Sequence, residues 1–566
     1  MNFIRNHFAV FALLVILGLS SAGVKAQQSQ EFEISKNLDI FVTLYKELNN
    51  NYVDDINASE LMQTGIDAML EDLDPYTVYI PESEIEDYRF MTTGEYGGIG
   101  SLIHQQNGKI IISEPYENSP AQKSGLKAGD RIIKVNDKTA EGKSVEDVSS
   151  ILKGQPGTTL KLEIERPGMN KPLNFNITRE KIVLDAVPYF GMLNDKIGYI
   201  KLSSFTQTAS AEVKKALLEL KQNPGMKGLI LDLRDNGGGL LTEAVNIVNL
   251  FVNKGELVVS TKGKQMDKNK TYRTMVDPVD PNIPLAVLVN GASASASEIV
   301  CGALQDLDRA VVIGRNTFGK GLVQNIIPLT YNTQVKVTVA KYYIPSGRCI
   351  QAIDYAHKDG NGKAGHIPDS LITAYKTQHG RTVYDGKGIA PDVELDTTRF
   401  SSVTFNLYAK YLIFDFATKY AAEHLQIDSP DQFKITDEIF NDFKKFVAEK
   451  GFEFSTPADK DLTDLKASAE EEGCWEDIKN DYEALKTRIE NHKSQDIDNK
   501  RDEISQLLQL EIVSRYYYQK GRIESSLSID KDLQESIKII NNSPVYTAIL
   551  DGTYVKPEKP ASGKKI

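Results

Sequence analysis

A serine and a lysine in two glycine- and alanine-rich stretches are the residues best placed to do chemistry. Ser295 lies in Ala-Ser-Ala-Ser-Ala-Ser (292–297), between an apolar run at 285–289 and a segment with helical spacing from Glu298 onward. Small residues between a buried strand and a helix can expose a nucleophile, and the N–H groups there can stabilise negative charge. Lys320 stands between two glycines in a later loop.

A serine hydroxyl needs a base to act as a nucleophile near neutral pH. None of the seven histidines of the chain lies in or beside this stretch. A lysine can take the role if burial lowers its pKa towards neutrality. The sequence therefore predicts that Ser295 works with Lys320, and Gln324 is expected one helical turn or a short loop beyond the lysine.

Two motifs carry a family resemblance. Ser-Ala-Ser-Ala-Ser-Glu-Ile, followed by Phe-Gly-Lys-Gly-x-x-Gln, closely resembles the carboxyl-terminal processing proteases, the tail-specific serine proteases of peptidase family S41. The resemblance implies that Ser295 is the nucleophile, Lys320 the general base and Gln324 the residue that orients the lysine. It also implies an oxyanion hole made by the N–H of Gly238, give or take one residue, and the N–H of Ala296. The alternative is a glycine turn needed only for backbone geometry.

Residues 95–180 resemble a PDZ domain. Gly-Gly-Ile-Gly-Ser-Leu-Ile (97–103) resembles the loop and strand that receive a peptide C-terminus, and residues 119–136 resemble the signature of these domains. Successive free N–H groups in a glycine-rich turn can capture a carboxylate, and the adjacent strand edge can pair with the peptide. We therefore expect Gly98, Ile99 and Gly100 to bind a peptide C-terminus beside a helix at 144–152.

Composition limits the other classes of function. The 566 residues are 41% hydrophobic and 25% charged, which is typical of a soluble protein with several domains. A net charge of −12 argues against nucleic acid as the main partner. Three widely spaced cysteines give neither a disulfide framework nor metal-ligand spacing, and no cluster of His, Asp and Glu suggests a metal. We expect neither a cofactor nor a metal.

The N-terminus has the features of a secretory signal peptide. Arg5 precedes an apolar run at 8–19, and small residues follow up to Ala26. We therefore expect residues 1–26 to be removed and the protein to be exported, to the periplasm. The alternative is an uncleaved membrane anchor, for which the apolar run is short.

The remaining segments differ in pattern. Residues 27–94 have helical spacing, and residues 181–400 alternate between strands and helices, which favours an α/β core. By resemblance, this core is related to the crotonase and Clp-protease folds. Residues 401–551 form a charged helical C-terminal extension, expected to pack on itself or on the core rather than to act as a partner-binding arm. Residues 552–566 are expected to be a flexible tail.

The sequence predicts a multidomain α/β protein, and the resemblance implies a serine endopeptidase that cleaves proteins near their C-termini. The expected partners are proteins or peptides with free C-termini, with an adaptor protein as a further candidate; the oligomeric state is not predicted. Two other classes stay open. One is a non-catalytic peptide- or ligand-binding protein on the same fold, as the retinoid-binding proteins of the eye resemble this family; the other is a PDZ scaffold with a structural core. The intact set of Ser295, Lys320 and Gln324 argues against the first of these.

Overall fold

The computed structural model describes residues 31–396 and 400–554, and the chain divides between Tyr79 and Ile80 into two compact units. The predicted signal peptide lies outside the described residues. In the first unit, residues 31–51 are helical and α2 spans Ala58–Glu71. Within the described part of the chain, no helix is long and apolar enough to cross a membrane.

The second unit contains a six-stranded sheet in the order β10-β11-β12-β15-β16-β23. Every neighbouring pair is parallel except β10 and β11. All residues of the central strands β12 (Gly228–Asp232) and β15 (Leu285–Val289) are buried, as expected of parallel strands covered on both faces. The α/β core predicted from the sequence is confirmed. The other strands are β10 (Tyr189–Met192), β11 (Ile197–Lys201), β16 (Val311–Gly314) and β23 (Val393–Glu394).

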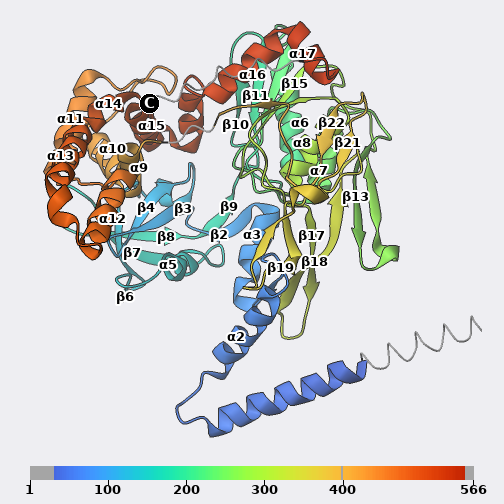
Figure 1. Ribbon diagram of the computed structural model, residues 1–566, viewed down its shortest axis with the longest axis horizontal. Helices are drawn as coiled ribbons and strands as arrows, with labels where there is room; N and C mark the ends of the chain where they lie inside the picture. The colour runs from blue at the N-terminus through green and yellow to red at the C-terminus, as the bar shows by residue number, and fades with distance from the viewer. Residues whose placement is uncertain (1–30, 397–399, 555–566) are drawn as a thin grey trace, which may run out of the picture. The chain divides into compact units, whose positions relative to one another are not determined.

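Helices from two distant parts of the chain cover the two faces of this sheet (Figure 1). The first face packs on α6 (Ala209–Leu220), α7 (Leu241–Val248) and α8 (Ala296–Asp306). The second packs on α16 (Lys531–Asn541) and α17 (Ser543–Leu550), which belong to the C-terminal extension. The C-terminal extension therefore supplies one of the two helical layers of the core.

The attachment of the last helix is specific. The Tyr546 hydroxyl lies 2.9 Å from the backbone N of Leu285 and 3.1 Å from its O, within central strand β15. The N–H groups of Thr553 and Tyr554 donate to the carbonyl of Ala548. The first residues of the expected tail are thus held against α17, and residues 555–566 lie outside the described residues.

A second, antiparallel sheet lies beside the core. Its strand β18 (Gln334–Tyr343) pairs with β17 (Leu322–Pro328) on one side and β13 (Leu257–Gly263) on the other. Strand β14 (Lys270–Arg273) pairs with the far side of β13. The polar stretch after β18 contains short hairpins: β19 (Ile353–Lys358) with β20 (Ala364–His366), and β21 (Ala374–Lys376) with β22 (Thr382–Tyr384).

The predicted PDZ domain is a small β-rich module with its own apolar core. Strand β3 (Ser101–Gln106) is an edge strand of its sheet, and α5 (Val145–Leu152) packs beside it. A free strand edge next to a helix is the arrangement that receives an added peptide strand. The remaining elements are β2 (Glu95–Gly98), β4 (Lys109–Pro115), α4 (Pro120–Lys123), β5 (Arg131–Val135), β6 (Lys138–Thr139), β7 (Thr159–Glu165), β8 (Leu173–Thr178) and β9 (Glu180–Val183).

The rest of the C-terminal extension is a helical bundle with a separate apolar core. Its longest helix, α15 (Arg501–Ser526), is interrupted at Tyr518, where φ is 53° and ψ is −159°. Next to this break, the Tyr518 hydroxyl accepts a hydrogen bond of 2.7 Å from Gln122 of the β-rich module. The other helices are α9 (Ser402–Ala409), α10 (Leu412–Glu423), α11 (Asp437–Glu449), α12 (Pro457–Glu471), α13 (Trp475–Ser494) and α14 (Asp496–Asn499).

Candidate active site

Ser295 lies at the turn between β15 and α8, at the carboxyl edge of the core sheet. Its φ of 56° and ψ of −113° are a conformation that residues other than glycine rarely adopt. Such a strained strand-to-helix turn presents a nucleophile above the sheet. Ser293 and Ser297 differ, because both are fully buried and each Oγ donates a 2.8 Å hydrogen bond to a backbone carbonyl. Among the three serines, only Ser295 is partly exposed.

A buried carboxylate joins this turn to the lysine loop, which we define as residues 316–321. Oε2 of Glu298 accepts the backbone N–H of Ser295 at 2.8 Å and that of Lys320 at 2.9 Å. Oε1 accepts the Thr317 hydroxyl at 2.5 Å and the N–H of Gly319 at 2.7 Å. One side chain therefore fixes the backbone at both residues expected to form the dyad, and the sequence analysis assigned it no role.

The environment of Glu298 perturbs its ionisation. Burial raises the pKa of this carboxyl to about 7, although the hydrogen bonds from Thr317 and from the backbone oppose the change. All four donors point at the ionised form, which accepts two hydrogen bonds on each oxygen. The site is therefore built for a carboxylate in this position.

A tyrosine makes a second link between the same two residues. The Tyr342 hydroxyl, on β18, lies 2.5 Å from the carbonyl oxygen of Lys320 and 3.2 Å from that of Ser295. The side chain of Tyr342 is almost completely buried, at 1% exposure. The structure thus brings the backbones of Ser295 and Lys320 together through two independent side chains.

Gln324 lies on strand β17 rather than on a helical turn or in a loop. The reason is that residues from Leu322 onward pair with β18. The Gln324 amide donates a 3.1 Å hydrogen bond to the Thr338 hydroxyl on that neighbouring strand. The lysine loop is further fastened by Gln351, whose Oε1 accepts the N–H of Gly321 at 2.7 Å.

The glycine turn, residues 237–239, packs directly against Ser295. Gly238 has a φ of 102°, and a Cβ on it would lie only 2.9 Å from the Cβ of Ser295 and from the N of Ala296. The N–H of Gly238 donates to Oδ1 of Asn236 at 2.9 Å, while the N–H groups of Gly237, Gly239 and Ala296 donate to no group within the described part of the chain. Free amides therefore lie on both sides of Ser295.

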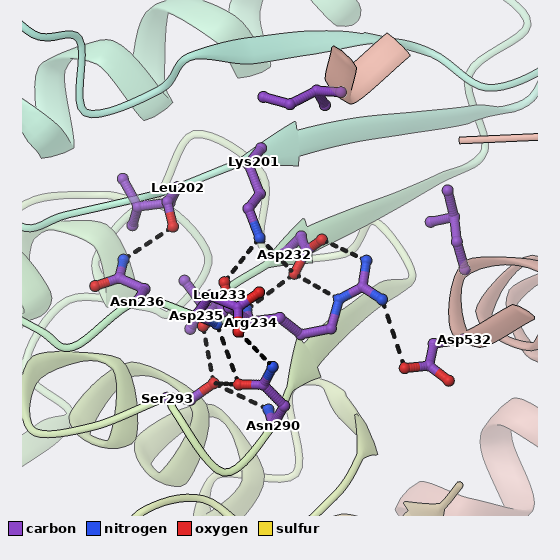
Figure 2. A network of polar contacts seen from close by, with 12 residues as sticks. Lys201, Leu202, Asp232, Leu233, Arg234, Asp235, Asn236, Asn290, Ser293 and Asp532 are labelled. Atoms are coloured by element: carbon purple, nitrogen blue, oxygen red, sulfur yellow. Dashed lines mark hydrogen bonds and ion pairs between the residues drawn. The ribbon is translucent and has the colours of Figure 1, made fainter. Parts of the chain in front are cut away.

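Asn236 holds the glycine turn in place, and Figure 2 shows its contact with Leu202. Its side-chain N donates to the carbonyl of Leu202 at 2.9 Å, and its own carbonyl accepts the N–H of Ala294 at 3.0 Å and the Ser297 hydroxyl at 2.8 Å. Asn236 is fully buried. This residue was not singled out from the sequence either.

Charged side chains surround the start of the same turn (Figure 2). Asp232, at the end of β12, contacts Arg234 at 2.6 Å and Lys201 at 3.4 Å. Burial by itself would raise the pKa of Asp232, but the two cations outweigh it and hold that pKa below its usual range. Arg234 is thereby fixed three residues before the glycine turn.

The residues expected to bind a peptide C-terminus form a tight turn between β2 and β3. Gly100 has a φ of 73°, and a Cβ there would lie 2.4 Å from the Cβ of Ser119. The Ile99 side chain is buried in the module's core, and its carbonyl accepts the N–H of Ala121. Within residues 31–396 and 400–554, the N–H groups of Ile99 and Gly100 donate to no other group, whereas Gly98 pairs with β9.

Comparison with protein families assigns most segments of the chain. Residues 196–357 match the model described as Peptidase family S41, and residues 111–166 match the model of the PDZ domain. Residues 403–540 match the C-terminal helical domain of probable PDZ-proteases. Residues 10–83 match the N-terminal domain of the activating protease CtpB.

Curated relatives agree with these matches. A carboxy-terminal-processing protease from Bartonella bacilliformis is 38% identical over 321 residues, which are 56% of this chain and 73% of that protein. A probable CtpA-like serine protease from Staphylococcus aureus is 33% identical over 369 residues, which are 65% of this chain and 66% of its own length. The photosystem II D1 C-terminal processing protease is 27% identical, covers 63% of this chain and 92% of its own, and has a TM-score of 0.35.

Proposed function

The chain belongs to peptidase family S41, the carboxy-terminal-processing proteases, and on that premise we propose that it is a serine endopeptidase with a Ser295–Lys320 dyad. The observation that carries the proposal is the Glu298 carboxylate, which accepts the backbone N–H groups of both residues on one oxygen. A core with a purely structural role has no need to tie a strained, half-buried serine to a glycine-flanked lysine.

In the first half of the reaction, Ser295 Oγ attacks the carbonyl carbon of a substrate peptide bond. The neutral amine of Lys320 accepts the hydroxyl proton as general base. In this proposal the resulting oxyanion is stabilised by the N–H of Ala296 and the N–H of Gly237 or Gly239, which donate to no other group within the described part of the chain. When the C–N bond breaks, Lys320 returns the proton to the leaving amine and an ester on Ser295 remains.

In the second half, a water molecule attacks the ester carbonyl while Lys320 accepts one of its protons. The intermediate then breaks the bond to Oγ, and Ser295 recovers its hydroxyl proton from Lys320. Gln324 orients the lysine from strand β17 without adding a charge that would favour the ammonium form. Neither half-reaction calls on a cofactor.

The PDZ domain selects substrates by their free C-termini in this proposal. The N–H groups of Ile99 and Gly100, which have no acceptor among the described residues, suit a terminal carboxylate, and the outer edge of β3 beside α5 suits an extended peptide. A peptide identical except for an amidated C-terminus removes the charge and should be processed much more slowly. Equal rates for the free acid and the amide would mean that the domain does not read chain ends.

We place the protein outside the cytoplasm, in the periplasm, after cleavage of a signal peptide that ends at Ala26. The support is the order of charged, apolar and small residues in 1–26. Sequencing the N-terminus of the mature protein should give Gln27. An intact N-terminus on the exported protein would favour the membrane anchor instead.

The test of the activity compares wild type with Ser295→Ala on an unfolded protein substrate. We expect Ser295→Ala to abolish cleavage and Ser293→Ala, the matched control, to leave a measurable rate, because the Ser293 hydroxyl is buried against Leu233. Cleavage at the wild-type rate by Ser295→Ala would remove the assignment. If wild type is also inactive but binds peptides with free C-termini, the chain is a binding protein on this fold.

A further inference from the structure

Two aspartates of the C-terminal extension, Asp530 and Asp532, lie beside the edge of the core sheet that carries Ser295. Helix α16 contacts the strands β12, β15 and β16, from whose carboxyl ends the glycine turn, Ser295 and the lysine loop follow. Asp530 caps the N-terminus of α16, with Oδ1 accepting the N–H of Leu533 at 3.0 Å, and Asp532 lies in the first turn. The start of α16 is therefore fixed at that edge.

The first target of these acids is Arg234, three residues before the glycine turn. Its Nη2 atom contacts Oδ2 of Asp530 at 2.6 Å and also Oδ2 of Asp232 at 2.6 Å. Asp232 is close to Arg234 in the sequence, whereas Asp530 is 296 residues away from it. Arg234 thus links the core to the C-terminal extension, and Figure 2 shows its contacts with Asp232 and Asp532.

The second target is Arg315, which directly follows β16 and precedes the lysine loop. Its Nη1 contacts Oδ2 of Asp532 at 2.7 Å, and its Nη2 lies 3.3 Å from Oδ1 of the same carboxylate. Two parallel contacts of this kind hold a guanidinium in both position and orientation. The pair is largely shielded, with side-chain exposures of 22% for Arg315 and 12% for Asp532.

Asp532 joins the two targets. The Oδ2 atom that contacts Arg315 also lies 3.5 Å from Nη1 of Arg234. One carboxylate of the C-terminal extension therefore bridges the residues from which the glycine turn and the lysine loop depart. The network formed by Lys201, Arg234, Arg315, Asp232, Asp530 and Asp532 has equal numbers of positive and negative charges, so loss of Asp532 leaves an excess of positive charge at this edge.

We infer that Asp532 is a positioning residue for catalysis, which sets the spacing between the oxyanion-stabilising glycine turn and the lysine loop through Arg234 and Arg315. The inference rests on the proposed function. It also makes the C-terminal extension part of the catalytic unit rather than an appended module. Misplacement of a catalytic group by about 1 Å can cost about 10²-fold in rate, so a bridge of this kind has a large effect for its size.

The test is Asp532→Asn in the full-length protein, with peptidase activity measured per active site titrated by a fluorophosphonate. We expect kcat per titrated site to fall by about 10²-fold with KM changed less than about 2-fold, and Asp532→Glu to recover part of the loss. The matched control is Asp437→Asn, since Asp437 also lies in the first turn of a C-terminal helix and pairs with an arginine, Arg501, away from the core. It should leave kcat unchanged.

Each outcome has a defined meaning. An unchanged kcat per titrated site overturns the inference, even if fewer molecules fold. The reason is that a residue with a purely structural role would change only the number of folded, active molecules and not the rate of each one. Should Asp532→Asn fail to fold, Arg315→Lys replaces it, since this change keeps the charge but loses the paired contact; unchanged kcat there likewise refutes the bridge. Inactivity of wild type, or full activity of Ser295→Ala, refutes the proposed function instead.

Discussion

Replacing Glu298 by glutamine should uncouple the nucleophile from the lysine loop. Glutamine has the same shape, but its NH2 group is a donor and would face two of the four groups that now donate to the carboxylate. The less costly orientation turns the NH2 towards Thr317 and Gly319, because the Thr317 hydroxyl can rotate and accept. The N–H of Gly319 then has no acceptor.

The free-energy cost of Glu298→Gln has two parts. A buried donor without an acceptor costs about 1–3 kcal/mol. The bonds from Ser295 and Lys320 remain but now reach a neutral oxygen, and each loses about 1 kcal/mol relative to a charged acceptor. The total is about 3–5 kcal/mol. Expressed wholly in the activation barrier, at about 1.4 kcal/mol for each factor of ten, this is a loss of about 10²- to 10⁴-fold in kcat.

Two measurements divide this loss between the barrier and the fold: kcat per titrated active site, and the free energy of unfolding from urea denaturation. Glu212→Gln is the matched control. Glu212, on α6, also accepts one backbone N–H, from Val187, and one hydroxyl, from Thr208, but it bonds neither to Ser295 nor to the lysine loop. We expect the control to keep kcat. If Glu298→Gln retains kcat within a factor of two and loses less than about 1 kcal/mol of stability, the assigned role is wrong.

Three further predictions concern the same machinery. A plot of log kcat/KM against pH should approach a slope of two below pH about 7, because Lys320 and Glu298, whose pKa burial raises to about 7, must both lose a proton; a slope of one would exclude Glu298. The raised pKa also means that the contribution of Glu298 to stability declines as the pH rises from 4.5, the pKa of this group in the unfolded chain, to about 7. Lys320→Arg should be inactive in the peptidase assay because arginine stays protonated, and turnover at the wild-type rate would exclude the lysine as base. Gly100→Ala should weaken binding of a fluorescent peptide with a free C-terminus by about tenfold or more, because the left-handed backbone conformation costs a residue other than glycine about 1–2 kcal/mol and the new methyl group meets Ser119. Binding is measured by fluorescence anisotropy, and an unchanged affinity would show that the turn does not bind the peptide.

The local patterns of the core were readable from the sequence. The apolar run expected as a strand at 285–289 is β15 with the same bounds, because a fully buried parallel strand needs apolar residues at every position. The turn that presents Ser295 follows from small residues between that strand and a helix. The signal for Glu298 was also present, since a serine followed three residues later by glutamate is typical of a capping box, in which the glutamate accepts the serine N–H.

Other features depend on contacts between distant segments, which leave no local pattern. Nothing near Asp532 in the sequence indicates that it meets Arg315, from which it is separated by 217 residues. The placement of α16 and α17 on the second face of the sheet is of the same kind: both are amphipathic helices, and amphipathicity shows that a face is buried without showing against what. Gln324 is a different case, because it lies in a hairpin with the next strand, β18, and the start of β17 directly after the lysine loop was not anticipated.

The backbone conformation of Ser295 lowers the stability of the fold at the residue that the proposed activity requires. A side chain held at a φ of 56° and a ψ of −113° costs about 1–3 kcal/mol that glycine would not incur. Ser295→Gly should therefore unfold at a higher temperature than wild type while lacking the nucleophile, and an unchanged or lower melting temperature would show that the turn is not strained. Selection for folding alone thus favours glycine here, so the serine persists only as long as proteolysis itself is selected.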